Sequence, residues 1–100
     1  MFVTTAHYPT AHASKYLQQL CKHFGHKVEV SFDASTGRAA LPPGPAELSA
    51  DAQGLTIRLT APDAKGMIHA RFIVDSHLVT FAHREGFTGL SWAVETAAEH

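Results

Sequence analysis

The segment at residues 55–60 constrains the fold most, because its apolar and polar side chains alternate strictly. Its apolar residues are Leu55, Ile57 and Leu59, and a polar residue follows each of them. In an extended chain successive side chains point to opposite faces, so one face of this strand is apolar and the other polar. Such a strand belongs in a sheet that is covered on one side only. The rest of the chain must therefore supply neighbouring strands and a covering layer.

Three further segments before this strand have the composition of short strands. They lie at residues 28–32, 38–41 and 46–50, and turn-forming residues separate them. An opening strand is expected at residues 2–8. Consecutive strands joined by short turns are typical of an antiparallel meander, which predicts an antiparallel sheet with one covered face.

A first helix is expected directly after the opening strand, with Thr10 as its cap and Gly25 as its stop signal. Apolar residues recur at spacings of three and four along this segment and form one stripe: Ala13, Leu17, Leu20, Cys21 and Phe24. This stripe predicts that the helix packs on the sheet. Cys21, as a member of it, is expected to be buried and slow to react.

A second, longer helix is expected from the cap residue Asp63 to about His83. Its core stripe consists of Met67, Ala70, Val74, Leu78 and Phe81. A second apolar stripe points away from the first and consists of Ile68, Phe72 and Val79. Three large apolar groups together in water are unfavourable, so this surface is expected to contact a second copy of the chain or a larger protein.

These elements predict a single α+β domain at residues 1–95, with two helices packed on one face of an antiparallel sheet. The expected order is β-α-β-β-β-β-α, with a final strand at residues 90–94. Residues 96–100 are expected to form a frayed tail. One hundred residues suffice for one hydrophobic core and not for two.

Charge and cysteine content exclude several classes of function. The formal net charge is -1 and no extended basic run occurs, so nucleic acid and anionic membranes are not expected as partners. Cys21 is the single cysteine, which rules out an intramolecular disulfide and fits a reducing compartment. No signal peptide or membrane span is recognisable, so the cytoplasm is the expected location.

Eight histidines in one hundred residues are the compositional anomaly of the chain. The polar face of the first helix is expected to carry His12, Tyr16, Gln19, His23 and His26. Of its histidines, only His23 and His26 are close enough to chelate one divalent transition metal ion, and a third ligand would be needed. Candidates for it are His7, Glu29, His77 and His83. The favoured alternative is that the histidines are solvated or hydrogen-bonded to backbone and carboxylates.

Familiar catalytic signatures are absent from the sequence, which contains no phosphate-binding glycine loop, HExxH motif or nucleophile elbow. Ser76 and His77 are adjacent, but neighbours on a helix point about 100° apart and do not share a proton. We interpret both residues as structural or partner-facing. No catalytic residue is assigned.

Three segments carry a resemblance to a known family: residues 17–27 (LQQLCKHFGHK), 76–78 (SHL) and 81–85 (FAHRE). With them, nearly the whole chain resembles the small bacterial domain called DUF2218. The resemblance implies a TBP-like or phosphomutase C-terminal-like α+β fold and an unknown function. It also implies an occasional fusion to siderophore-interacting ferric reductase modules, and it supplies no catalytic residues.

Three functions stay open on the sequence. The first is a non-enzymatic binding or protein-interaction module, a homodimer or a partner of a larger redox or siderophore-interacting protein, with a link to iron metabolism that only the family association suggests. The second is a small metal-binding protein that uses His23 and His26. The third is a small enzyme with a histidine acid or base.

Overall fold

The alternating segment forms β5 (Gly54–Ala61), which lies in the middle of the sheet. It pairs antiparallel with β4 (Ala46–Asp51) on one side and with β1 (Phe2–Tyr8) on the other. The apolar side chains of β5 are almost wholly buried, and Thr56, Arg58 and Thr60 between them are half-buried or exposed. The expectation of a sheet with one covered face is confirmed.

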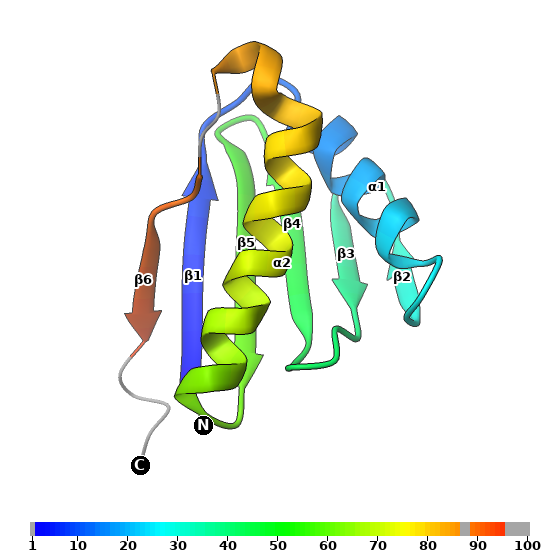
Figure 1. The fold of residues 1–100 in the computed structure, drawn as a ribbon. Coiled ribbons are helices and arrows are strands. Elements are labelled where there is room, and N and C mark those ends of the chain that lie inside the picture. Colours follow the sequence, from blue (N-terminus) through cyan, green and yellow to red (C-terminus); the bar gives the residue numbers. More distant parts are fainter. Residues whose placement is uncertain (1, 87–88, 96–100) are drawn as a thin grey trace.

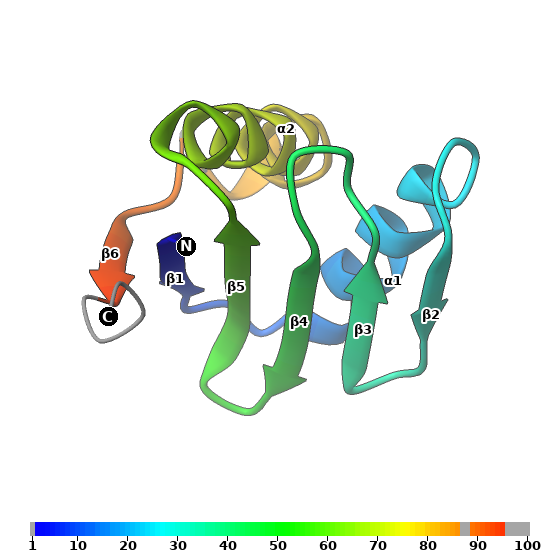
Figure 2. The same cartoon turned by 90° about the horizontal axis from the view of Figure 1, so that it is seen from below.

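The computed structural model describes residues 2–86 and 89–95. Over these ranges the remaining strands are β2 (Val30–Phe32), β3 (Thr36–Ala39) and β6 (Trp92–Glu95). The sheet has the order β2-β3-β4-β5-β1-β6, and each neighbouring pair is antiparallel (Figure 2). The meander from β2 to β5 is as predicted. The expected tail at residues 96–100 lies outside the described residues.

Both helices lie on the same face of the sheet (Figure 1). The first helix, α1 (Ala13–Phe24), contacts β2, β3, β4 and β5, whereas α2 (Ala64–Ala82) contacts β5 and β1. A short 3-10 helix, η1 (His83–Glu85), continues α2. The element order and the α+β class agree with the prediction. Within the described residues, neither helix is long and apolar enough to cross a membrane.

The apolar stripe of α1 is buried as predicted, and Cys21 has no exposed surface. The helix lies very close to β3, because a Cβ atom at Gly37 would stand 2.8 Å from the Cys21 Sγ atom and 3.2 Å from Leu17 Cδ2. Any side chain at Gly37 would therefore displace α1. The close approach explains why a glycine occupies the middle of this strand.

Two expectations for α1 are wrong. Thr10 does not cap the helix, which begins at Ala13 after His12; the Thr10 hydroxyl instead accepts a hydrogen bond from the His12 N–H at 3.1 Å. Tyr16 does not lie on a solvated face, since it is only 4% exposed. Its ring packs in the core while its hydroxyl reaches a carboxylate, which a binary division into polar and apolar residues misses.

The predicted cap and core stripe of α2 are confirmed. The Asp63 carboxylate accepts a hydrogen bond from the Gly66 N–H at 2.7 Å. Four of the five predicted stripe residues are buried, Phe81 is half-buried against the core, and Ala82 completes the stripe. On the outer side, Ile68 and Phe72 are both 67% exposed. Val79, expected with them, is half-buried and packs against the core.

A single carboxylate ties the segment that leads into β6 back to α2. Asp75 Oδ1 accepts a hydrogen bond from the Leu90 N–H at 3.2 Å, and its Oδ2 accepts one from the Trp92 indole at 3.3 Å. In β1, the strand next to β6, the Thr4 hydroxyl donates a hydrogen bond to the Ala93 carbonyl at 2.9 Å. These bonds hold the predicted final strand against β1, where it begins at Trp92, two residues later than expected.

Candidate functional site

Half of the histidines line one cleft between the C-terminal end of α1 and the middle of α2. These are His23 and His26 from the α1 side and His69 and His77 from α2. The cleft has a volume of ≈ 330 Å³, which lies in the range of small-molecule sites. It contains both histidines that the sequence singled out as metal ligands.

Hydrogen bonds in the turn after α1 position the residues that this end of the helix contributes to the rim of the cleft. The Gly25 N–H donates to the Cys21 carbonyl at 2.9 Å, and the Lys27 N–H donates to the Phe24 carbonyl at 3.0 Å. The chain therefore winds tightly around the helix end before β2 begins. This turn puts His26 and Lys27 beside His23 rather than further along the strand.

The helical period of α2 determines which of its residues line the cleft. His69, Ile73 and His77 are spaced four residues apart, so they lie on one side of the helix. The two imidazoles stand about two turns apart, with the Ile73 side chain between them. Sequence reasoning missed His69, although this spacing could have indicated it.

The floor and walls of the cleft are apolar. They consist of Phe24, Val28, Leu41, Pro42 and Ile73. Phe24 and Leu41 belong to the buried core, so the floor is supported from beneath. The polar side chains of the lining are the four imidazoles and the Lys27 ammonium group, and no aspartate or glutamate from the described part of the chain belongs to it.

His23 and His77 are in close contact, with ring centroids 4.6 Å apart. The His77 Nδ1 atom lies 2.6 Å from the Ile73 carbonyl oxygen. A carbonyl only accepts, so Nδ1 carries the proton and, in the neutral ring, Nε2 carries the lone pair. His26 is further from His23, at 5.9 Å between ring centroids.

Desolvation and neighbouring basic groups favour the neutral form of the His23 ring. Desolvation lowers the pKa of His23 from its usual 6.5, and His77, His26 and Lys27 lower that pKa further by electrostatic repulsion. The rim thus concentrates groups that carry or can acquire positive charge.

The predicted third metal ligands fall in different places. His7 accepts from the Thr56 hydroxyl at 2.9 Å and donates to the Gln53 carbonyl at 3.1 Å, and His83 donates to the Thr80 carbonyl at 3.1 Å. Glu29 lines a separate hollow beside Arg38. Of the four candidates, the cleft brings only His77 to His23. The described residues contain no group of three or more side chains that could hold a metal ion.

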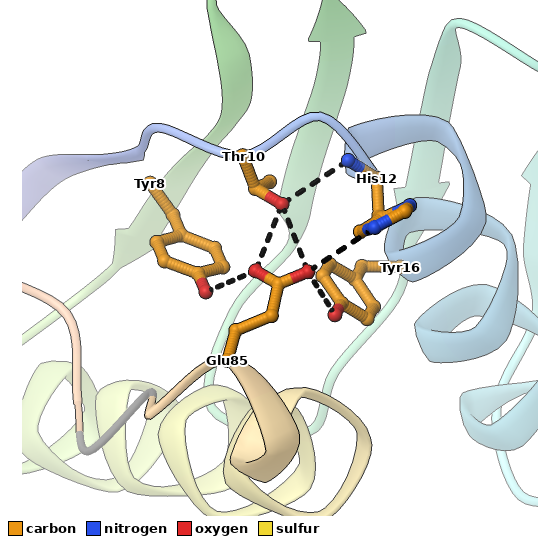
Figure 3. Close-up of polar contacts among 5 residues, drawn as sticks. All are labelled: Tyr8, Thr10, His12, Tyr16 and Glu85. Carbon is orange, nitrogen blue, oxygen red and sulfur yellow. Dashed lines mark hydrogen bonds and ion pairs between the residues drawn. The ribbon is translucent and has the colours of Figure 1, made fainter.

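A second polar cluster surrounds Glu85 at the end of η1 (Figure 3). The hydroxyls of Tyr8 and Tyr16 each donate to this carboxylate at 2.6 Å, and Thr10 donates at 2.9 Å. The His12 Nε2 atom stands 3.7 Å from Oε2. Sequence reasoning did not single out Glu85, because its partners lie some seventy residues away in the chain.

The hydrogen bonds of this cluster separate the pKa values of its members. Burial and the Glu85 carboxylate raise the pKa of Tyr8 and of Tyr16 to about 12. The hydroxyl donors, Tyr16 first, lower the pKa of Glu85 below 4.5. At neutral pH the tyrosines keep their protons and the carboxylate stays charged, so the cluster acts as a clamp between helix ends.

Other reactive groups are also engaged or buried. Burial raises the pKa of the Cys21 thiol to about 11, which keeps it protonated. The Ser76 hydroxyl donates to the Ile73 carbonyl at 3.2 Å, the same oxygen that His77 binds. Ser76 and His77 therefore share one backbone acceptor, the Ile73 carbonyl oxygen.

Comparison with known proteins agrees with this fold. The NMR structure of PA4090 from Pseudomonas aeruginosa is similar, with a TM-score of 0.74 and 33% sequence identity over 97% of this chain and 98% of that chain. No curated protein matches the sequence. Residues 5–93 match the model of a family described as uncharacterised protein conserved in bacteria. The chain belongs to this family, DUF2218.

Proposed function

We propose that this domain is a non-enzymatic binding module that holds a small, largely apolar molecule in the cleft between α1 and α2. The cleft itself carries the proposal, because it is a hollow of ≈ 330 Å³ with an apolar floor and imidazole groups in its lining. Apolar clefts with a few polar groups at the rim are typical of small-molecule sites.

The state of the polar groups supports binding rather than catalysis. The Glu85 carboxylate is occupied by three hydroxyl groups, and the Cys21 thiol is buried and protonated. His77 is hydrogen-bonded to a backbone carbonyl, and among the residues that the structure describes no carboxylate lines the cleft to orient either His77 or His23. A general base of the usual histidine type is oriented by such a partner.

A neutral fluorescent dye, N-phenylnaphthylamine, tests this proposal. We expect saturable binding of one dye per chain to the native protein. Ile73→Trp places an indole in the cleft and should abolish binding, whereas Ile68→Trp, on the exposed side of the same helix, should leave it unchanged. Val28→Trp fills the cleft from the opposite wall and is the alternative variant if Ile73→Trp does not fold. Binding to the filled variants as strong as to wild type would contradict the proposal.

A second candidate function is self-association through α2, favoured by one observation. Ile68 and Phe72 are one turn apart and both 67% exposed, so they form an apolar ridge on the outer side of the helix. Two copies related by a two-fold axis would each bury this ridge against the other. A net charge of -1 offers little repulsion between copies.

Light scattering tests the self-association. We expect a dimer mass for the wild-type protein and a monomer mass for Phe72→Glu. Phe32→Glu, at an exposed phenylalanine on β2, is the matched control and should remain dimeric. A monomer mass for wild type at high concentration would contradict the proposal. In that case we expect the apolar ridge to bind a different protein, such as the redox or siderophore-interacting type that the family resemblance implies.

A further inference from the structure

We infer that the ligand of the cleft is an amphipathic acid, with an apolar body on the cleft floor and a carboxylate or sulfonate at the rim formed by His23, His26, His77 and Lys27. The inference rests on the proposed function and adds to it the charge of the ligand. It follows from the charge composition of the lining and from the proximity of the donor groups.

The charge composition is one-sided. The chain carries nine acidic residues against eight lysines and arginines, yet none of the acidic side chains that the structure describes lines the cleft. Four imidazoles and one ammonium group gather there instead. A bound anion would offset their mutual repulsion, whereas a bound cation would add to it. Charge complementarity therefore favours an acidic ligand.

Donor groups lie close together at this rim. The ring of His23 lies 4.6 Å from that of His77 and 5.9 Å from that of His26 between centroids. The Ile73 carbonyl holds the Nδ1 proton of His77, so Nε2 is the ring nitrogen that remains for a ligand. Lys27 lines the same cleft and offers an ammonium group beside the apolar floor.

Two dyes with the same apolar ring system distinguish the contribution of an acidic head group to binding from that of the apolar cleft floor. N-phenylnaphthylamine is neutral, and anilinonaphthalene sulfonate carries one negative charge on the same ring system. We expect the sulfonate to bind about tenfold more tightly than the neutral dye. The double variant His26→Gln and Lys27→Gln should remove most of this preference. Lys22→Gln, at an exposed position of α1 outside the cleft, is the matched control.

The outcomes distinguish the two proposals. Equal affinity of both dyes for the wild-type protein overturns the acidic ligand and leaves the apolar cleft in place. A preference that the double variant retains in full also overturns it. Binding of neither dye overturns the proposed function together with this inference. Circular dichroism of each variant establishes that its fold is unchanged, since sulfonate dyes also bind partly unfolded chains.

Discussion

The Glu85 Oε2 atom accepts a hydrogen bond of 2.6 Å from the Tyr16 hydroxyl, and this contact joins the end of the second helical segment to the first turns of α1. Tyr8, at the end of β1, donates to the other carboxylate oxygen at the same distance. One carboxylate thus connects three elements near one end of the sheet (Figure 3). The clamp positions α1 relative to α2, and the cleft lies between these two helices.

Removal of the buried hydroxyl from this clamp should destabilise the domain. Tyr16→Phe deletes a charge-assisted hydrogen bond at a side chain that is only 4% exposed, and we expect the free energy of unfolding to fall by about 1 to 2 kcal/mol. Tyr8→Phe should cost less, because Tyr8 is half-buried and water can replace its hydroxyl. Urea denaturation of both variants measures the difference. Equal stability of Tyr16→Phe and wild type would show that the bond contributes nothing.

The clamp should also make the domain sensitive to alkali. The chain contains two tyrosines, and both have a native pKa of about 12 against 10.0 for the free group. Between these values the unfolded chain loses protons that the native state retains, so stability should fall as the pH rises from 10 towards 12. Ultraviolet titration of phenolate absorbance measures the ionisation directly. Ionisation of both rings near pH 10 in a folded protein would contradict the clamp.

The fold was largely predictable because its strands and helices carry strong local periods. The alternation in β5 and the stripe from Met67 to Leu78 each require a specific element and a specific buried face. The place of β1 between β5 and β6 was not predictable in the same way. Its register with β5 pairs Phe2 with Ala61, and no local pattern encodes a partner some sixty residues distant.

The candidate site was predictable only where its residues are neighbours in the chain. His23 and His26 were identified from their spacing at the end of α1. His77 joins them only because α1 and α2 pack on the same face, which brings its ring to 4.6 Å from that of His23. The sequence pattern placed Tyr16 on the polar face of α1, but the structure buries its ring. A tyrosine ring can be buried while its hydroxyl is hydrogen-bonded, here to Glu85. Tertiary packing, rather than composition, decides both cases.

Cys21 should react slowly with thiol reagents in the native protein. The side chain has no exposed surface, and burial raises the pKa of its thiol to about 11, so both access and thiolate formation are unfavourable. Labelling should accelerate by orders of magnitude in denaturant, where the thiol has an ordinary pKa. Gly37→Ala should raise the native rate, because the new Cβ atom would stand 2.8 Å from Sγ and displace α1. Labelling at the same rate in native and denatured protein would mean that Cys21 is exposed.

Any binding of a divalent transition metal ion should be weak and should depend on the rings around His23. His23 lies 4.6 Å from His77 and 5.9 Å from His26 between ring centroids, and the described residues provide no third ligand for either pair. Zinc titration should therefore lose most of its signal in His23→Ala and part of it in His26→Ala and in His77→Ala, with His83→Ala, outside the cleft, as the control. Because the pKa of His23 is lowered below 6.5, this ring should stay available to the metal at a lower pH than an ordinary imidazole. Equal zinc affinity in wild type and His23→Ala would exclude the cleft as the metal site.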